Sequence, residues 1–317
     1  MKFSGCWFQK TFWVGLFIAG LLAMPFAPLW AADEVKEPSA HKEPLAAPAA
    51  AAAEEKPTGD FTVTALNQYI WRGYELSRNS VVIQPSMTVG YKGFAVNLWG
   101  NLDTNPYFSG TGGTKYSNTW NETDLTLSYT KTLGLFNVGG GYIYYALGAL
   151  NKDAVKRADA QELFATVSLN TLLSPTLTVY KEVSSYRQWY FLLGVSHTFE
   201  LNPVVSLKLG ASASYLQSTY ADATLFNAGA GYGGYPKFDG NALATNDKFS
   251  NFHDGVISAS LPIKATGFIT VTPTVSYIFP LSGDAKDEMK GQGLKGSAPA
   301  DRDSSYVVGG VAASFTF

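Results

Sequence analysis

Residues 304–317 read SSYVVGGVAASFTF and end on an aromatic side chain. Side chains of a β-strand alternate between its two faces, so every second residue lies on the same side. One face would then carry Val307, Gly309, Val311, Ala313, Phe315 and Phe317. The stretch is therefore predicted to form a strand with one apolar face.

A terminal strand of this kind resembles the closing strand of bacterial outer-membrane β-barrels, in which aromatic residues at the end form an assembly signal. The resemblance assigns that role to Phe315 and Phe317. It also implies two partners, which are the lipid of the outer membrane and the barrel-assembly machinery. The rest of the chain is expected to supply the other strands.

From residue 60 onward the chain reads as short segments in which apolar and polar residues alternate, and with the terminal segment we count twelve. Each has about the 9–11 residues that a tilted strand needs to cross the hydrocarbon of a membrane. The polar faces consist of Ser, Thr, Gly and Asn, with too little charge for the exterior of a soluble sandwich. The pattern predicts an all-β fold, a transmembrane antiparallel up-and-down β-barrel of about 12 strands.

The connections between these segments alternate in length. The longer ones are 74–79, 102–119, 148–158, 218–251 and 279–304, while short turns such as Lys92-Gly93 lie between them. One exception, the connection near Ser184 and Ser185, is short although a long one is expected there. An outer-membrane barrel has short periplasmic turns and longer outer loops. We therefore expect both ends of the chain to lie in the periplasm of a Gram-negative bacterium.

Aromatic residues near strand ends are typical of the belts at the membrane–water interface. The first segment, FTVTALNQYIWRG at 61–73, is read as one strand that places Trp71 toward lipid and Arg72 toward the lumen. The residues assigned to the belts are Tyr69, Trp71, Trp99, Trp120, Tyr129, Tyr144, Tyr190 and Phe317.

The first 59 residues have a different character. Residues 1–31 show the basic start, apolar centre and small-residue cleavage site of a signal peptide. Residues 32–59 are rich in Pro, Ala, Glu and Lys and are predicted to be a disordered periplasmic tether. Residues 60–317 form the predicted barrel. The single cysteine, Cys6, lies in the signal peptide, so the mature chain is predicted to contain neither a disulfide nor a thiolate metal site. No cofactor is predicted.

The charge of the barrel region is nearly balanced. Of 23 basic and 25 acidic residues, five and six precede residue 60, which leaves 18 and 19. This balance gives no electrostatic footprint for nucleic acid. It also gives no overall preference for anions or cations.

The stretch YIWRGYELS at 69–77, followed by VVIQPSMTVGYKGFAVNLWGNLD at 81–103, carries a second resemblance. It is similar to the start of an uncharacterised proteobacterial family of small outer-membrane proteins, the TorF-like proteins, which open with a Tyr-x-Trp/Phe-Arg-Gly motif. The resemblance implies an outer-membrane barrel and no catalytic residues.

Strict alternation points a few charged side chains into the lumen: Arg72, Asp124, Glu162, Glu182 and Lys208. Buried charges are retained when they are paired or hydrated. These residues are read either as a constriction that selects solutes or as salt bridges that stabilise the interior. The expected partners of Arg72 are acidic residues on the lumen faces of other strands or in loops, with Asp103 and Asp124 the nearest candidates in chain order.

The outer loop 218–251 carries aromatic residues spaced by glycines, namely Phe226, Tyr232, Tyr235 and Phe238. Such rings could stack on a solute, or the loop could fold into the barrel mouth as a plug. The acidic and basic run DAKDEMK at 284–290 lacks the ligand spacing of a calcium loop and is read as solvated.

No enzyme is predicted. His253 and Asp254 are adjacent, so strict alternation sends them to opposite faces, and no serine stands in a nucleophile context. The leading interpretation is a passive, porin-like channel for small polar solutes. The alternative is a closed barrel that acts as a structural or adaptor protein and binds a protein partner through its outer loops or its tether.

Overall fold

The computed structural model describes residues 56–107, 117–147, 159–184, 186–219, 234–293, 295, 298 and 301–317. The predicted signal peptide and most of the predicted tether lie outside these residues. The first strand begins at Thr58, so residues 58 and 59, which we had placed in the tether, belong to the barrel.

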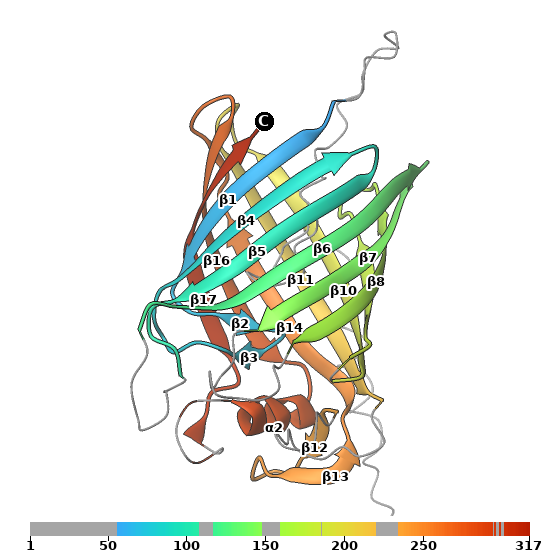
Figure 1. Ribbon diagram of the computed structural model, residues 1–317, viewed down its shortest axis with the longest axis vertical. Helices are drawn as coiled ribbons and strands as arrows, with labels where there is room; N and C mark the ends of the chain where they lie inside the picture. Colours follow the sequence, from blue (N-terminus) through green and yellow to red (C-terminus); the bar gives the residue numbers. More distant parts are fainter. Residues whose placement is uncertain are drawn as a thin grey trace, which may run out of the picture.

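Within the described residues, twelve antiparallel strands form one closed barrel (Figure 1). The barrel closes because β17 pairs with both β1 and β16, and β16 also pairs with β14. The fold class predicted from the sequence is confirmed. The strands are β1 (Thr58–Leu66), β4 (Val82–Tyr91), β5 (Phe94–Asp103), β6 (Thr119–Leu133), β7 (Phe136–Leu147), β8 (Ala160–Leu169), β9 (Thr176–Glu182), β10 (Gln188–Glu200), β11 (Ser206–Ser218), β14 (Ser250–Ser260), β16 (Ile269–Pro280) and β17 (Tyr306–Thr316).

The two ends of the barrel differ. One end, here called the turn end, has the short connections 92–93, 134–135, 170–175, 201–205 and 261–268, the last of which contains β15 (Ile263–Lys264). Residues 58 and 317 lie at the same end, since β1 and β17 run antiparallel. The other end, here called the plug end, carries α2 (Gly283–Gln292) and the hairpin of β12 (Pro236–Phe238) and β13 (Ala244–Lys248), which are seen below the barrel in Figure 1.

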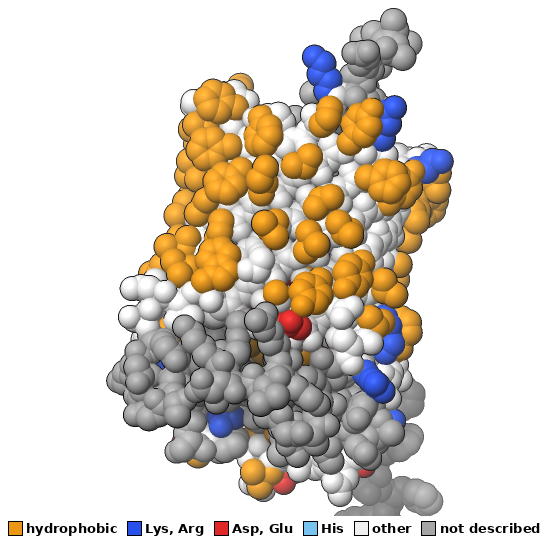
Figure 2. Space-filling model, in the orientation of Figure 1, with side chains coloured by type: hydrophobic (Ala, Val, Ile, Leu, Met, Phe, Trp, Pro, Cys, Tyr) orange, Lys and Arg blue, Asp and Glu red, His pale blue; other side chains and the backbone are white. Residues whose placement is uncertain are grey.

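The outer wall of the barrel is apolar. Along β5 the outward side chains of Phe94 and Leu98 are 65% and 53% exposed, whereas the inward Asn97 is 2% exposed. Figure 2 shows such hydrophobic side chains spread over the wall, with very few charged ones among them. An apolar exterior around a closed, internally hydrogen-bonded sheet defines a transmembrane β-barrel. Among the described residues, no helix has the length and apolar character required to traverse a membrane.

The first connection does not continue the first strand as the sequence suggested. β1 ends at Leu66, and a separate hairpin of β2 (Ile70–Trp71) and β3 (Tyr74–Glu75) follows. Arg72 and Gly73 connect these two strands with φ angles of 48° and 80°. Two consecutive positive φ angles are what a type I′ turn requires, so the chain reverses at Arg72 and folds back into the barrel.

Three of the eight aromatic residues assigned to the belts instead face the interior. Tyr69, Trp99 and Tyr190 are 2%, 5% and 1% exposed. Trp71 is also not in a belt, because it packs against the buried clusters of the interior. The outward placement holds for Trp120, Tyr129 and Phe317, which are 50%, 42% and 72% exposed.

The run DAKDEMK is not a solvated loop. It lies in α2, whose N-cap is Ser282, with the Ser282 Oγ accepting a hydrogen bond from the Ala285 amide. Glu288 and Met289 in this helix are fully buried. The helix therefore covers the plug end of the barrel, and its Glu288 side chain points into the interior.

Candidate functional site

The plug, defined as residues 67–77 together with α2, fills the barrel at one end. Its central side chain is Arg72, at the tip of the β2–β3 hairpin. The guanidinium donates from Nη1 and Nη2 to the two carboxylate oxygens of Glu162, both at 2.8 Å. It also lies over the rings of Trp71, Tyr180 and Tyr190, with 4.6, 4.9 and 4.2 Å to their centroids. A bidentate carboxylate and three aromatic faces are the partners that a buried guanidinium prefers.

Glu162 is held in place from the barrel wall. It lies on β8 opposite Ile143 of β7, and its Oε2 accepts a second hydrogen bond from the Tyr145 hydroxyl at 2.9 Å. Glu162 is 1% exposed, so both charges of the pair are removed from water. The partner is an acidic residue on the lumen face of another strand, as expected, but the two nearest candidates, Asp103 and Asp124, were wrong. The tight turn aims Arg72 across the lumen at β8 rather than at β5 or β6.

A second chain of contacts ties the hairpin to α2 and to β14. The Tyr74 hydroxyl donates to Glu288 Oε1 at 2.9 Å and lies 3.2 Å from His253 Nε2. His253 Nε2 lies 3.1 Å from Glu288 Oε2, and its Nδ1 lies 2.9 Å from Asp254 Oδ1. All four side chains are buried. The imidazole thus joins a carboxylate of the helix to a carboxylate of the wall.

A β-bulge makes this arrangement possible. Between the pairs Ala213↔Gly255 and Tyr215↔Phe252, one residue of β11 faces two residues of β14. The extra residue lets both His253 and Asp254 turn inward, contrary to strict alternation. Ser214 stabilises the bulge, because its Oγ accepts from the Asp254 amide at 2.8 Å and contacts the Asp254 carboxylate at 2.6 Å.

Two further contacts fix the flanks of the hairpin. The Tyr69 hydroxyl donates to Glu122 of β6 at 2.8 Å, and the Tyr107 hydroxyl donates to Glu75 at 3.0 Å. Burial raises the pKa of Glu75, although the hydrogen bond from Tyr107 opposes this shift. Burial also raises the pKa of Tyr107 above its ordinary value, and the Glu75 carboxylate adds to that rise.

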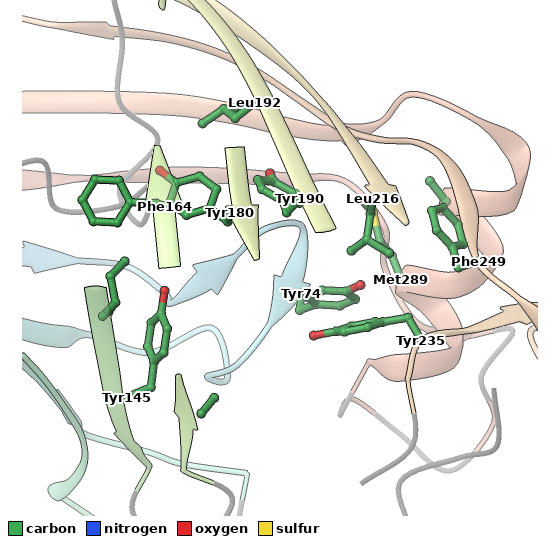
Figure 3. Packing of buried hydrophobic residues seen from close by; sticks show 13 residues of the cluster. Tyr74, Tyr145, Phe164, Tyr180, Tyr190, Leu192, Leu216, Tyr235, Phe249 and Met289 are labelled. Atoms are coloured by element: carbon green, nitrogen blue, oxygen red, sulfur yellow. The ribbon is translucent and has the colours of Figure 1, made fainter. Parts of the chain in front are cut away.

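The packing around the hairpin spans the whole cross-section. There are two buried clusters, one mainly along β7–β11 and α2 and the other along β1, β4, β5, β14, β16 and β17, and both contact Trp71 and Leu76. Figure 3 shows the first of these clusters. The barrel interior is thus filled at the plug end. Each of the twelve strands supplies a buried side chain: Leu66, Val82, Trp99, Asp124, Tyr145, Glu162, Tyr180, Tyr190, Leu216, Val256, Ile278 and Val308.

The sequence-predicted lumen residues fall into different places. Arg72 and Glu162 form the central pair, and the buried Asp124 lies on β6 opposite Tyr145. Glu182 instead orders the β9–β10 turn by accepting from the amides of Ser184, Tyr186 and Arg187. Lys208 lies on β11 opposite Thr198 and Ser260, toward the turn end and away from the plug.

Two of the four loop aromatics can be placed. Tyr235 stacks on Tyr74 with 5.8 Å between centroids, as Figure 3 shows. Phe238 is 3% exposed and packs so closely on α2 that a Cβ on Gly291 would lie 2.1 Å from its ring. Phe226 and Tyr232 lie outside the described residues. Tyr235 and Phe238 therefore extend the packing of the plug.

Toward the turn end, inward side chains are mainly hydroxyls and amides. Thr62 donates to Ser314, and the hydroxyls of Thr166 and Thr178 lie 3.0 Å apart. Asn97 donates to Ser86 and Thr88 on the neighbouring strand. The lining between the plug and the turn end is polar and contrasts with the aromatic and charged packing at the plug end.

Ser214, His253 and Asp254 lie together in the interior, but their contacts differ from those of a catalytic triad. Ser214 contacts Asp254 rather than His253, and carboxylates occupy both ring nitrogens of His253. A serine nucleophile requires the histidine itself as its base. In the part of the chain that the structure describes, no group of three or more His, Cys, Asp or Glu is suited to hold a metal ion.

Sequence reasoning missed Tyr74, Tyr180, Tyr190 and Glu288 as members of the site. The sequence contained one signal for the hairpin. Trp71-Arg72-Gly73-Tyr74 has the same order, aromatic, basic, Gly, aromatic, as Tyr91-Lys92-Gly93-Phe94, which was read correctly as a turn. In both, the basic residue and the glycine have positive φ angles.

Comparison with known proteins adds the following. No model of a protein family matches the chain, and no curated protein matches it. Solved structures with a similar fold include the NanC porin, at 11% identity over 80% of this chain and 98% of that one, with a TM-score of 0.46. The KdgM porin is similar at 9% identity over 82% and 99% of the two chains, with a TM-score of 0.42. At these identities and scores the likeness carries no argument about function.

Proposed function

We propose that the protein is a channel of the bacterial outer membrane for small polar solutes, and that the plug closes it in this conformation. The main support for this proposal is that the connection 67–77, rather than side chains of the wall alone, occupies the centre of the lumen. Its strands β2 and β3 pair with each other in a separate small sheet. The polar contacts of Arg72, Tyr69 and Tyr74 and the packing in the two buried clusters hold the connection in the lumen. A segment held in this way can leave the lumen without breaking the barrel.

The hydroxyl and amide lining toward the turn end supports the same proposal. A barrel of about this strand number can be filled by its own side chains or can leave a narrow path. Uncharged polar groups line a path that suits small hydrated solutes without strong charge preference. The short turns at the turn end, which also carries residues 58 and 317, favour placing that end in the periplasm. Membership in the TorF-like family remains a proposal based on the motif at 69–77.

The geometry suggests a direct experiment. Leu66 of β1 and Val82 of β4 are paired, so residues 68–80 can be replaced by a short Gly-Ser turn without altering the barrel strands. We expect the full-length protein to show rare openings in planar bilayers and the shortened variant to conduct steadily. The control is Lys237→Gln, which removes an exposed ion pair with Asp284 and should conduct like the wild type.

The second candidate is a closed barrel that serves as a structural or adaptor protein. It is favoured by the buried packing around the hairpin at the plug end. If the shortened variant folds, as judged by heat-dependent mobility in gels, and still does not conduct, the channel proposal fails and the closed barrel is retained.

A further inference from the structure

The surroundings of the Arg72 guanidinium belong mostly to the barrel wall and not to the plug. Four neighbouring strands supply them, with Tyr145 on β7, Glu162 on β8, Tyr180 on β9 and Tyr190 on β10. The hairpin contributes the guanidinium itself and one further ring. The wall therefore forms a site that keeps its carboxylate, its hydroxyl and two aromatic faces when the hairpin leaves.

The geometry of this wall site suits a planar cation. Glu162 presents its two carboxylate oxygens to two guanidinium nitrogens, both at 2.8 Å, and the Tyr145 hydroxyl donates to one of these oxygens at 2.9 Å. The guanidinium carbon lies 4.9 and 4.2 Å from the ring centroids of Tyr180 and Tyr190, which are 6.1 Å apart (Figure 3). A flat, charged fork matches all of these groups, whereas an ammonium ion is a point charge that cannot form the two parallel hydrogen bonds.

Contacts within the wall hold the site in shape without the hairpin. The Tyr190 hydroxyl donates to Asp254 Oδ1 of β14 at 2.9 Å. The Tyr180 ring packs against Phe164 of β8 with 5.9 Å between centroids. A site that is already arranged costs less to occupy, because fewer side chains must be ordered on binding.

The charge of the wall at the plug end also favours a cation. Buried carboxylates of the described barrel strands face inward there, among them Glu122, Asp124, Glu162 and Asp254. Within the same described strands, no Lys or Arg side chain faces inward at that end, and Lys208 lies toward the turn end. Once Arg72 leaves, these carboxylates attract a positive solute.

A free cation and Arg72 compete for one place. The hairpin tethers Arg72 to the wall, which gives it an effective concentration on the order of millimolar. A solute that occupies the wall site binds only after Arg72 has left it. Such a solute therefore shifts the plug toward the open form.

We propose that the wall site of Tyr145, Glu162, Tyr180 and Tyr190 binds the guanidinium group of a small cationic solute, and that Arg72 is its internal competitor in the closed form. This assignment rests on the proposed function in one respect, because the hairpin must leave the lumen before the solute enters the site. It places selection by charge at the plug end, whereas the turn end has a mainly uncharged lining.

The test measures binding to the shortened variant, in which a Gly-Ser turn replaces residues 68–80. Isothermal titration calorimetry in detergent compares ethylguanidinium with ethylammonium, which has the charge without the fork, and with N-ethylurea, which has a similar planar shape without the charge. We expect ethylguanidinium to bind about tenfold more tightly than either of the other two ligands. It should bind the full-length wild type about tenfold more weakly than the shortened variant, because Arg72 competes there.

Two substitutions in the shortened variant locate the binding. Glu162→Gln should abolish the preference for ethylguanidinium, and it leaves no unpaired cation because Arg72 is absent. Asp247→Asn changes an exposed carboxylate of β13 and is the matched control, which should keep the preference. The site is rejected by equal binding of the three ligands, by a preference that survives Glu162→Gln or disappears with Asp247→Asn, or by equally tight binding to the full-length protein.

The site and the channel fail in different ways. A shortened variant that conducts without preferring ethylguanidinium rejects the site and leaves the channel, whereas one that shows the preference without conducting rejects the channel and leaves the site. If this variant does not fold, Arg72→Gly is measured, since glycine readily adopts the φ of 48° found at this turn. Ethylguanidinium should then raise the melting temperature of Arg72→Gly more than N-ethylurea does, and equal effects of the two ligands reject the site.

Discussion

Arg72 and Glu162 are 90 residues apart in the chain and form a two-point ion pair inside the barrel, with both N–O distances at 2.8 Å. One partner lies at the tip of an inserted hairpin and the other on a strand of the wall. The pair therefore joins a removable element to the fixed frame. Because Arg72 lies on the hairpin, the ion pair exists only while the hairpin occupies the lumen.

Glu162→Gln should destabilise the folded barrel strongly. The change leaves the Arg72 guanidinium buried without its counter-charge, which costs about 3–5 kcal/mol in unfolding free energy. Urea unfolding in lipid vesicles, followed by tryptophan fluorescence, measures this. Lys237→Gln is the control, since its partly exposed ion pair with Asp284 should be worth only about 0–1 kcal/mol. The double variant Arg72→Met/Glu162→Met should be more stable than Glu162→Gln, because no unpaired charge remains. Equal stability of Glu162→Gln and wild type would contradict the role given to this pair.

Gly73→Ala should dislodge the hairpin. Gly73 has a φ of 80°, and a Cβ there would lie 2.4 Å from the Met289 Cε. Met289 is fully buried in α2, so its terminal methyl would have to shift within packed surroundings. Gly134→Ala provides the control, because Gly134 has a φ of 63° but no atom within 4 Å of an added Cβ. The control should show only the backbone cost of about 1 kcal/mol.

The steric part of this prediction can be isolated. Gly73→Ala should lower the unfolding free energy less in a protein that already carries Met289→Ala than it does in the wild type. Additive effects of the two substitutions would mean that Gly73 and Met289 do not meet, and that the hairpin lies elsewhere in solution.

The strands could be predicted from the sequence, whereas the plug could not. Alternation along β5 or β17 depends on each residue's neighbours in the strand, and the membrane selects apolar outward side chains such as Phe94 and Val307. The same rule could have placed Trp99 correctly, since it shares parity with Asn97 and Asn101. It was assigned to a belt on its residue type alone, and the parity was the better guide.

The site depends on features that strict alternation cannot represent. The turn at Arg72-Gly73 reverses the chain within a segment that reads as a continuous strand. The bulge opposite Ser214 turns both His253 and Asp254 inward. In α2, the buried Glu288 and Met289 lie in a largely polar helix whose single contact face becomes evident only when β3 and β14 surround it. The turn has a local signal in the basic residue and glycine between two aromatic residues, whereas the bulge and the buried face of α2 depend on long-range packing.

The stability of the plug should fall as pH rises above the ordinary range of glutamate. Burial raises the pKa of Glu75 in the folded protein, so the folded state binds the proton more tightly than the unfolded one. The resulting penalty is absent below the unfolded pKa and grows as pH rises from there to the raised folded value. Glu75→Gln should remove it, because glutamine can still accept the hydrogen bond from Tyr107. We expect this variant to exceed wild-type stability at pH 8 and to match it near pH 4. A difference that is constant between these pH values would exclude titration of Glu75 as the cause.

The predicted tether can be shortened only to the edge of β1. The Gly59 amide donates to the Phe317 carbonyl at 2.7 Å, and the Phe317 amide donates back at 2.9 Å. Deletion of residues 33–55 should therefore leave folding intact, while deletion of 33–59 should weaken the closing seam. Heat-dependent gel mobility of the purified proteins compares the two. The same loss of folding in both would indicate that the tether supports the barrel.

Removal of residues 311–317 should prevent the barrel from closing. These residues pair with 60–65 of β1 on one side and with 269–273 of β16 on the other. Their loss leaves unpaired backbone groups in the hydrocarbon, which a membrane does not tolerate. We expect no folded, heat-modifiable band even when the purified chain is refolded in detergent.

Phe317→Ala separates closure from signalling, because it keeps the backbone pairs with Gly59 and removes only the exposed ring. This variant should refold in detergent like the control Leu172→Ala, a comparably exposed side chain, but should reach the outer membrane of cells more slowly. Normal assembly of Phe317→Ala in cells would show that the ring is not the signal, and a folded 311–317 deletion would show that β17 does not close the barrel.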